Sequence, residues 1–175
     1  MEENKISGFK KINNFILYKE LGRGSYGEVY LSKDQRLDKL TAVKVINRKK
    51  LSETIGLQKF LNQINFLSKL NHPNTAKILD KQKTSNNYYI ELEYCNGPDL
   101  LEYLKRYKEK YHKPLSENVV QKIAFQIAKG LEYLHKLKII HRDIKLENLV
   151  INFDNISNSS LGLSDSDILK KKISF

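Results

Sequence analysis

The stretch LGRGSYGEVYL, residues 21–31, carries the spacing G-x-G-x-x-G-x-V at Gly22, Gly24, Gly27 and Val29. Glycine lets the backbone approach phosphate oxygens and offer N–H groups without a side chain in the way. The same spacing occurs in dinucleotide-binding folds, but there the third glycine opens a helix. Here the chain continues with strand-forming residues, so the stretch predicts a strand, a glycine turn and a second strand. In isolation, such a turn needs no function.

A third short strand is predicted by TAVKVI, residues 41–46, which is rich in β-branched residues. This strand contains Lys44, 17 residues beyond Gly27. A lysine within an apolar strand is usually an edge residue whose ammonium group reaches water. Taken alone, Lys44 therefore indicates no site.

The remaining pattern predicts more strands up to Gly97 and helices after it. Residues 57–70 have apolar side chains at three- and four-residue intervals, which predicts an amphipathic helix ended by Asn71-His72-Pro73. Two further strands are predicted at residues 76–82 and 87–95, and two helices at 99–111 and 117–137, the second with Ser116 as its N-cap.

This order predicts an α+β protein with two lobes joined at Gly97-Pro98. The expected divisions are a flexible N-terminus at 1–14, a small β-rich lobe at 15–96 and a helical, partial large lobe at 97–175. Within the last, the Asn- and Ser-rich residues 152–166 are expected to be flexible, and ILKKKISF at the end is a possible returning strand.

The octet HRDIKLEN, residues 141–148, follows the longest predicted helix. An isolated HRD could be an exposed charged turn. Together with the glycine stretch, Lys44 and the order of elements, however, it resembles the protein kinase family, whose catalytic loop reads H-R-D-x-K-x-x-N. The resemblance runs from about Phe15 to the last residue. It implies an ATP-dependent protein kinase that uses Mg²⁺.

The resemblance implies catalytic roles for three residues of this octet. Asp143 would orient the substrate hydroxyl and accept its proton, and Lys145 would neutralise charge on the γ-phosphate. Asn148 would bind Mg²⁺ through its carbonyl oxygen, whereas His141 and Arg142 would hold the loop. A lysine two places after the aspartate is the serine/threonine form of the motif.

Nucleotide contacts are implied in the same way. Lys44 would grip the α- and β-phosphates, backbone groups of Glu93 and Cys95 would bond the adenine edge, and Asp99 would reach the ribose. The full set of implied nucleotide-binding residues is Leu21, Gly22, Gly24, Gly27, Val29, Ala42, Lys44, Glu93, Cys95 and Asp99.

One position departs from the family pattern. Gln63 stands where the family has a glutamate that pairs with the strand lysine. A glutamine can accept a hydrogen bond from Lys44 but brings no charge, and two opposite charges at contact near a surface attract by at most about 4 kcal/mol. Glu53, the nearest acid upstream, is expected to precede the helix. The departure predicts reduced activity.

The sequence as given ends at Phe175 without the D-F-G segment that supplies the chief Mg²⁺ ligand in the family. We therefore expect this chain alone to be weakly active or inactive. The alternative is a non-catalytic module that binds nucleotide or docks on a partner through an exposed apolar face of residues 117–137.

Composition sets the remaining expectations. The chain has 31 basic and 20 acidic residues, a net charge of +11, but the basic residues are scattered and match no nucleic-acid module. A single cysteine, Cys95, and no long apolar run predict a soluble, intracellular, cytoplasmic protein without a membrane span. The expected partner is a protein substrate with serine or threonine, and no nucleic acid is expected.

Overall fold

The computed structural model describes residues 4–6, 9–24, 27–54, 56–153 and 172–174. The chain forms two compact units, Met1–Leu70 with Lys77–Tyr94 and Asn71–Ala76 with Cys95–Phe175. The sequence suggested one crossing near Gly97, but the segment Asn71–Ala76 also belongs to the second unit.

Side chains explain why this segment joins the second unit. The backbone N–H of Asn71 donates to the hydroxyl of Tyr133 at 3.0 Å, and the His72 ring stacks on the Tyr133 ring at 4.9 Å. The Asn74 amide donates to the Gln126 side chain at 3.1 Å. These contacts join residues more than fifty positions apart, so local periodicity could not predict them.

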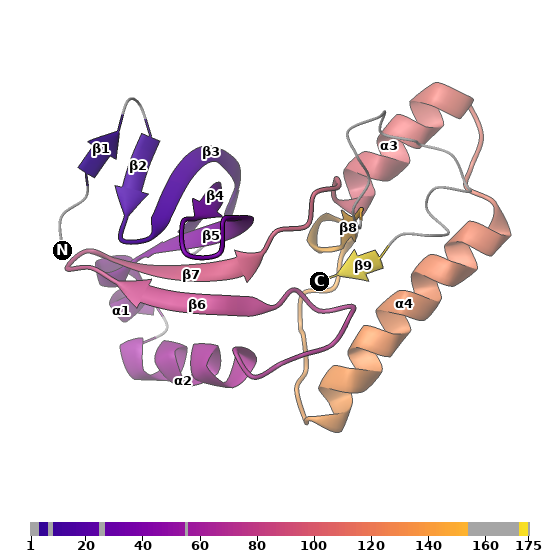
Figure 1. Cartoon of the computed structure of the whole chain (residues 1–175). Coiled ribbons are helices and arrows are strands. Elements are labelled where there is room, and N and C mark those ends of the chain that lie inside the picture. Colours follow the sequence, from indigo (N-terminus) through magenta and orange to yellow (C-terminus); the bar gives the residue numbers. More distant parts are fainter. Residues whose placement is uncertain (1–3, 7–8, 25–26, 55, 154–171, 175) are drawn as a thin grey trace. The chain divides into compact units, whose positions relative to one another are not determined.

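The first unit is built on a seven-stranded antiparallel sheet with the order β1-β2-β3-β4-β5-β7-β6 (Figure 1). Its strands are β1 (Asn4–Ile6), β2 (Phe9–Ile12), β3 (Phe15–Gly24), β4 (Gly27–Asp34), β5 (Lys39–Asn47), β6 (Ile78–Lys83) and β7 (Asn87–Glu93). Its helices are α1 (Arg48–Thr54) and α2 (Leu57–Leu67). The five strands and the amphipathic helix that the sequence predicted here are confirmed as β3 to β7 and α2.

The N-terminal segment differs from expectation. Residues 1–14 were expected to be loose, yet β2 pairs with β3, and Ile12 is 1% exposed against Phe15 and Leu17. Burying a side chain of this size contributes about 2 kcal/mol. β2 has only four residues, too few for an alternating pattern to be recognised, so its tertiary contacts define it.

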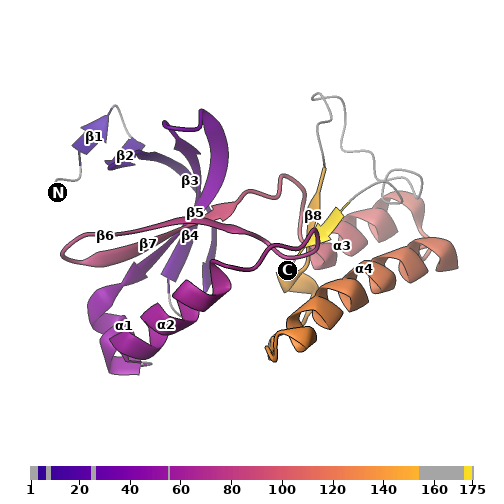
Figure 2. The same cartoon turned by 60° about the horizontal axis from the view of Figure 1, so that its bottom comes forward.

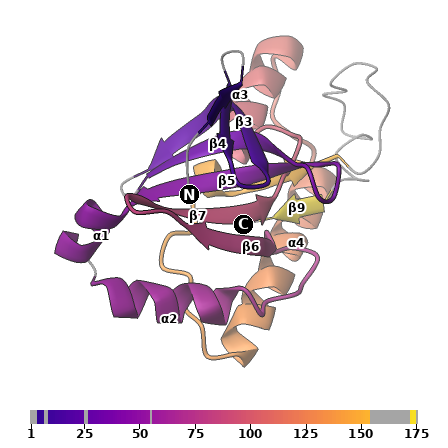
Figure 3. The same ribbon diagram turned by 60° about the vertical axis from the view of Figure 1, so that its left-hand side comes forward.

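The sheet buries side chains on both sides, and two names distinguish them. The "β2 face" is defined by Ile12, Phe15, Leu17, Val43 and Tyr89. The "helix face" is covered by α1 and α2 and is defined by Ile46, Leu51, Phe60, Tyr88 and Ile90. Figure 2 shows both helices on one side of the sheet and β2 on the other, and Figure 3 shows α2 running below β6.

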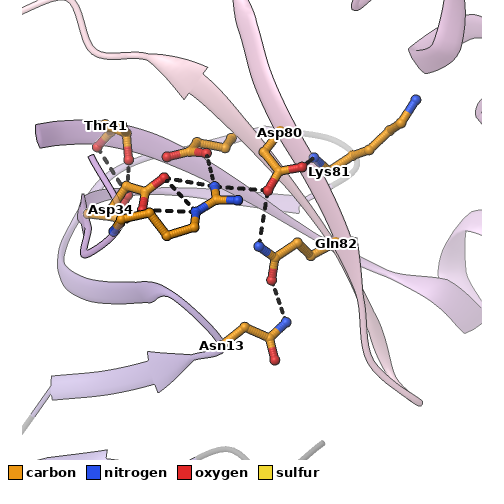
Figure 4. Close-up of polar contacts among 9 residues, drawn as sticks. Asn13, Asp34, Thr41, Asp80, Lys81 and Gln82 are labelled. Carbon is orange, nitrogen blue, oxygen red and sulfur yellow. Dashed lines mark hydrogen bonds and ion pairs between the residues drawn. The ribbon is translucent and has the colours of Figure 1, made fainter. Parts of the chain in front are cut away.

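A polar network closes one end of the β2 face (Figure 4). The Asp34 and Glu91 side chains are 0% exposed. Arg36 Nη2 lies 2.8 Å from Asp34 Oδ2, 3.0 Å from Asp80 Oδ2 and 3.5 Å from Glu91 Oε2. One guanidinium thus serves three carboxylates, and it ties the β4–β5 turn to β6 and β7.

The second unit packs α3 (Leu100–Tyr111) and α4 (Glu117–Lys136) side by side (Figure 2). A 3₁₀ helix, η1 (Leu146–Asn148), and the strands β8 (Val150–Asn152) and β9 (Lys172–Ser174) complete it. Its core consists of Leu100, Tyr103, Tyr107, Val119, Ile123, Leu149 and Ile151. Both predicted helices are confirmed, as is the returning strand, since β9 pairs with β8. Residues 154–171 lie outside the described residues, and so does most of the segment expected to be flexible.

Only part of the apolar stripe of α4 is covered. Ile123 and Leu134 are 8% and 4% exposed, whereas Val120 is 50% and Phe125 62% exposed. The expected exposed apolar surface is therefore present, but it is narrower than the sequence suggested.

Candidate functional site

The glycine turn is the end of the β3–β4 hairpin, where Gly24 pairs with Gly27 and Gly22 with Val29. A Cβ on Gly27 would lie 1.9 Å from the carbonyl oxygen of Val45, so only glycine fits this crossing of β4 and β5. Around Gly22 there is open space, with nothing within 4 Å of an added Cβ. Packing within the sheet therefore explains Gly27 but leaves Gly22 unexplained.

Lys44 lies beside two other predicted nucleotide-binding residues. It pairs with Val29 on β4 and follows Ala42 by two positions on β5, so the three side chains share the helix face. Leu92, the residue before the predicted adenine contact Glu93, pairs with Ala42. The first unit thus groups Val29, Ala42 and Lys44 on one side of the sheet.

No described carboxylate of the first unit balances the charge of Lys44. Burial alone lowers the pKa of the Lys44 ammonium group, and among the described residues no carboxylate raises it. Gln63 is exposed on α2, and Glu53 precedes α2, as expected, in the separate helix α1. A half-buried cation whose pKa no described carboxylate raises suits an anion from outside the sheet.

The octet of the second unit forms a compact cluster around Asp143. The Asn148 amide nitrogen donates to the Asp143 carboxylate at 2.8 Å and to its backbone carbonyl at 2.9 Å. Lys145 Nζ lies 3.3 Å from the other Asp143 oxygen. Hydrogen bonds from Asn148 and then Lys145 lower the pKa of Asp143, so this carboxyl group is an ionised acceptor at neutral pH.

The backbone around Asp143 is also specialised. Arg142 has φ 68°, a left-handed conformation that few residues other than glycine adopt. The Asp143 N–H donates to His141 Nδ1 at 3.3 Å, and burial lowers the pKa of that imidazole. A neutral His141 can accept this hydrogen bond, so His141 and Arg142 position the aspartate.

The geometry tests whether Mg²⁺ fits. The Asn148 nitrogen faces Asp143, which leaves the amide oxygen directed elsewhere as an acceptor. Among the described residues, no group of three or more His, Cys, Asp or Glu side chains could hold a metal by itself. Mg²⁺ usually takes one or two carboxylate-type oxygens and completes its shell with phosphate and water. The second unit therefore fits Mg²⁺ carried by a nucleotide better than free Mg²⁺.

The remaining predicted residues lie on β3, at the end of β7 and at the start of the second unit. Glu93 ends β7 and donates its N–H to the Lys77 carbonyl at 2.8 Å, and Cys95 opens the second unit in a half-buried position. Leu21 is 41% exposed on β3. Asp99 caps α3, because its carboxylate accepts from Glu102 N at 2.8 Å.

Two structural roles near the predicted hinge were missed from sequence. The Asp99 cap could have been found from the preference for aspartate at helix N-caps. Gly97 packs so closely against β8 that a Cβ would lie 2.3 Å from the Ile151 carbonyl oxygen. Nothing in the local sequence indicates that approach.

Within the described ranges, no helix is both long and apolar enough to cross a membrane.

Comparison with known proteins agrees with the motifs. Residues 15–171 match the model of the protein kinase domain. Aurora kinases of Saccharomyces cerevisiae, Schizosaccharomyces pombe and Yarrowia lipolytica are 31%, 33% and 32% identical over 157, 154 and 162 residues. These alignments cover 89%, 87% and 91% of this chain and 41%, 42% and 42% of the relatives, so the chain spans about two-fifths of their length. Because the family model covers most of the sequence, the chain belongs to the protein kinase domain family.

Proposed function

We propose that this chain supplies the ATP-binding and hydroxyl-activating parts of a serine/threonine protein kinase. The observation that carries the proposal is the Asp143 cluster, in which one carboxylate accepts hydrogen bonds from Asn148 and faces Lys145. Family membership supports the same reaction class. The substrate class is a protein that carries serine or threonine.

Asp143 orients the attacking hydroxyl and accepts its proton. Its ionised state suits an acceptor, and its 64% exposed side chain is open to a substrate. Lys145 offers positive charge to the transferred phosphoryl group, which carries charge on three equatorial oxygens. Asn148 offers its amide oxygen to Mg²⁺, which neutralises charge on the phosphates when it is bound.

Lys44 binds the phosphates from the first unit. Lys44 is half-buried, and no described carboxylate raises the pKa of its ammonium group, so a phosphate would supply the counter-charge. The glycine hairpin offers backbone N–H groups, and Val29 and Ala42 offer an apolar surface beside Lys44. The other proposed nucleotide contacts are Leu21, Gly22, Gly24, Gly27, Glu93, Cys95 and Asp99.

A second candidate function is a non-catalytic, nucleotide-binding module. It is favoured by Gln63, which is exposed on α2 and brings no charge to Lys44. A partner docked on the exposed Phe125 surface of α4 belongs to this candidate. We propose a cytoplasmic location for either function.

Transfer of γ-phosphate and binding of ATP separate these candidates. Purified residues 1–175 are assayed for phosphoryl transfer to a serine-containing basic peptide and for thermal stabilisation by ATP with and without Mg²⁺. Asp143→Asn should abolish transfer but keep most of the ATP-dependent stabilisation, whereas the exposed Asp38→Asn should change neither. Stabilisation without transfer in the unmodified chain supports the module, and no stabilisation at all overturns both candidates.

A further inference from the structure

Four side chains make a chain of polar contacts across the glycine hairpin, and none of them is among the proposed nucleotide contacts. Arg23 donates from Nε and Nη2 to the two carboxylate oxygens of Glu20, at 3.2 and 3.3 Å. Its Nη2 also lies 3.1 Å from one oxygen of Glu28, and the other oxygen of Glu28 accepts from the Tyr30 hydroxyl at 2.8 Å. We call Glu20, Arg23, Glu28 and Tyr30 the hairpin network.

The hairpin network lies on the side of the sheet opposite Lys44. Residues that pair directly in an antiparallel sheet place their side chains on the same face. Glu28 pairs with Val45, which packs against the β2-face cluster, and Arg23 pairs with Glu28. Lys44 precedes Val45 on β5 and therefore points to the helix face. The Arg23 guanidinium is thus engaged on the face away from Lys44, although its place in the glycine sequence would suggest a phosphate ligand.

The strand β3 is irregular where this network crosses it. The register between β3 and β4 shifts at two points, the second of them between Glu20 and Gly22. In a regular strand, side chains three residues apart point to opposite faces, which would separate Glu20 from Arg23. Because of the shift, these two residues pair with Tyr30 and Glu28, which are two positions apart and share a face. The hydrogen bonds from Arg23 to Glu20 therefore span the irregular segment.

Little else fixes the register of this part of β3. Glycine has no side chain to pack, and glycine-rich strands are prone to slip in register. An added Cβ on Gly22 would meet nothing within 4 Å, and one on Gly24 only the Gly27 carbonyl oxygen at 4.0 Å. The described pairs of β3 with β2 end at Leu17. The hairpin network thus supplies side-chain bonds between the two strands where packing supplies few.

We propose that Arg23 is a positioning residue for nucleotide binding, which fixes the register of the glycine hairpin through Glu20 and Glu28 and so holds its backbone N–H groups toward the phosphates. This inference rests on the proposed function. The side chains of Arg23, Glu20 and Glu28 are 66%, 39% and 36% exposed, and exposed ion pairs contribute little to folding. The effect is therefore expected in ATP affinity rather than in the stability of the chain.

Removing the two acids separates positioning from direct phosphate binding. Isothermal titration measures the dissociation constants of Mg-ATP and of adenosine for residues 1–175, for Arg23→Met and for Glu20→Gln/Glu28→Gln. Both variants should weaken Mg-ATP binding by about five-fold, the upper range for an exposed ion pair, and leave adenosine within about two-fold because it has no phosphates. If Arg23 bound phosphate directly, freeing it from both carboxylates would tighten Mg-ATP binding, and the two lost negative charges alone act in that direction.

The matched control is Lys19→Met, which removes an exposed positive charge from the same strand and should change neither constant. Amide hydrogen exchange without nucleotide tests the register itself. The amides of residues 20–24 should exchange at least three-fold faster in Arg23→Met than in the unmodified chain or in Lys19→Met. Arg23→Lys, which keeps the charge but loses the two-oxygen contact with Glu20, should give an intermediate rate.

The outcomes separate this inference from the proposed function. Unchanged Mg-ATP affinity in Arg23→Met, or tighter binding in the double variant, would overturn the role of Arg23 and leave the proposed function intact. Unchanged exchange at residues 20–24 would overturn it whatever the nucleotide result. An unmodified chain that does not bind Mg-ATP would overturn the proposed function, and the role of Arg23 in nucleotide binding with it.

Discussion

The two sides of the first-unit sheet each hold a charged side chain, and the surroundings of the two charges differ. On the helix face, Lys44 is half-buried with no carboxylate to raise its pKa among the described residues. On the β2 face, Glu91 is buried one register pair away, opposite Val43, and it lies 3.5 Å from Arg36. Two neighbouring positions in one sheet thus differ, because Glu91 has a described counter-charge beside it and Lys44 has none among the described residues.

The difference indicates which charge is structural and which awaits a ligand. A buried charge is costly unless it is paired and hydrogen-bonded. Arg36 lowers the pKa of Asp34 and opposes part of the burial cost of Glu91, whose pKa is still raised, so the network ties the β4–β5 turn to the sheet. Nothing described in the first unit does so for Lys44, and a function that brings phosphate to it would explain why the cost is tolerated.

Replacing Lys44 should have the largest effect on function. A hydrogen bond to a charged group contributes about 1.5–3 kcal/mol, so Lys44→Met should weaken ATP binding by about ten- to a hundred-fold. The variant should melt no lower than the unmodified chain without ATP, because it removes a desolvated charge. Isothermal titration with Mg-ATP measures the first effect, and calorimetric melting measures the second.

Lys39→Met, an exposed lysine on the same strand, is the matched control and should leave ATP binding unchanged. If Lys44→Met instead lowered the melting temperature and kept ATP affinity, Lys44 would be a structural residue, and the contrast with Glu91 would be lost.

Arg36→Met should have the largest effect on stability. The change leaves Asp34 and Glu91 buried without their shared cation. Removing one partner of a fully buried ion pair lowers the free energy of unfolding by about 3–5 kcal/mol. Because solvent reaches the half-exposed guanidinium of Arg36, we expect a smaller loss of about 2 kcal/mol. Urea unfolding measures this loss, with exposed Arg106→Met on α3 as the control. A loss no larger than in the control would show that the network contributes little.

The pH dependence of stability tests Glu91 itself. Burial raises the pKa of Glu91 to about 7, and the nearby charge of Asp34 adds to the rise. A hydrogen bond from Thr41 and the charge of Arg36 act in the opposite direction. Asp80 also faces it from β6. A raised pKa means that the folded state holds the proton more tightly than the unfolded chain, whose glutamate pKa is about 4.3. The stability that Glu91 contributes is therefore fully present below about pH 4.3 and is lost as pH rises through 7.

Glu91→Gln keeps the shape and removes the titration. The melting temperature of the variant minus that of the unmodified chain should therefore increase from pH 5 to pH 8. Subtraction removes contributions from other titrating groups such as His141. A constant difference across this range would mean that Glu91 is ionised throughout.

Sequence periodicity predicted the elements that form both faces, but not the balance of charge on them. β3 to β7 and α2 to α4 were recognised because each has a regular apolar pattern. The seven residues of α1 offer little pattern, and its anchor Leu51 is identified only by its 1% exposure. Asp143, Lys145 and Asn148 are close in sequence, so their clustering could be expected. In contrast, the contact between Arg36, which lies in a turn, and Glu91, 55 positions later, could not be expected from the sequence.

The smallest expected effect comes from changing Gln63 to glutamate. The family pattern pairs a glutamate at this position with the strand lysine, but here Gln63 is exposed on α2 and Lys44 stays unbalanced. If α2 can bring a carboxylate to Lys44, Gln63→Glu should raise phosphoryl transfer several-fold and change the free energy of unfolding by less than about 1 kcal/mol, the range of an exposed ion pair. Gln58→Glu, five residues earlier on the same helix, adds the same charge and should change neither quantity. An equal rise in both variants would reflect added negative charge alone, and a fall in Gln63→Glu would show that an uncharged side chain at this position is what Lys44 requires.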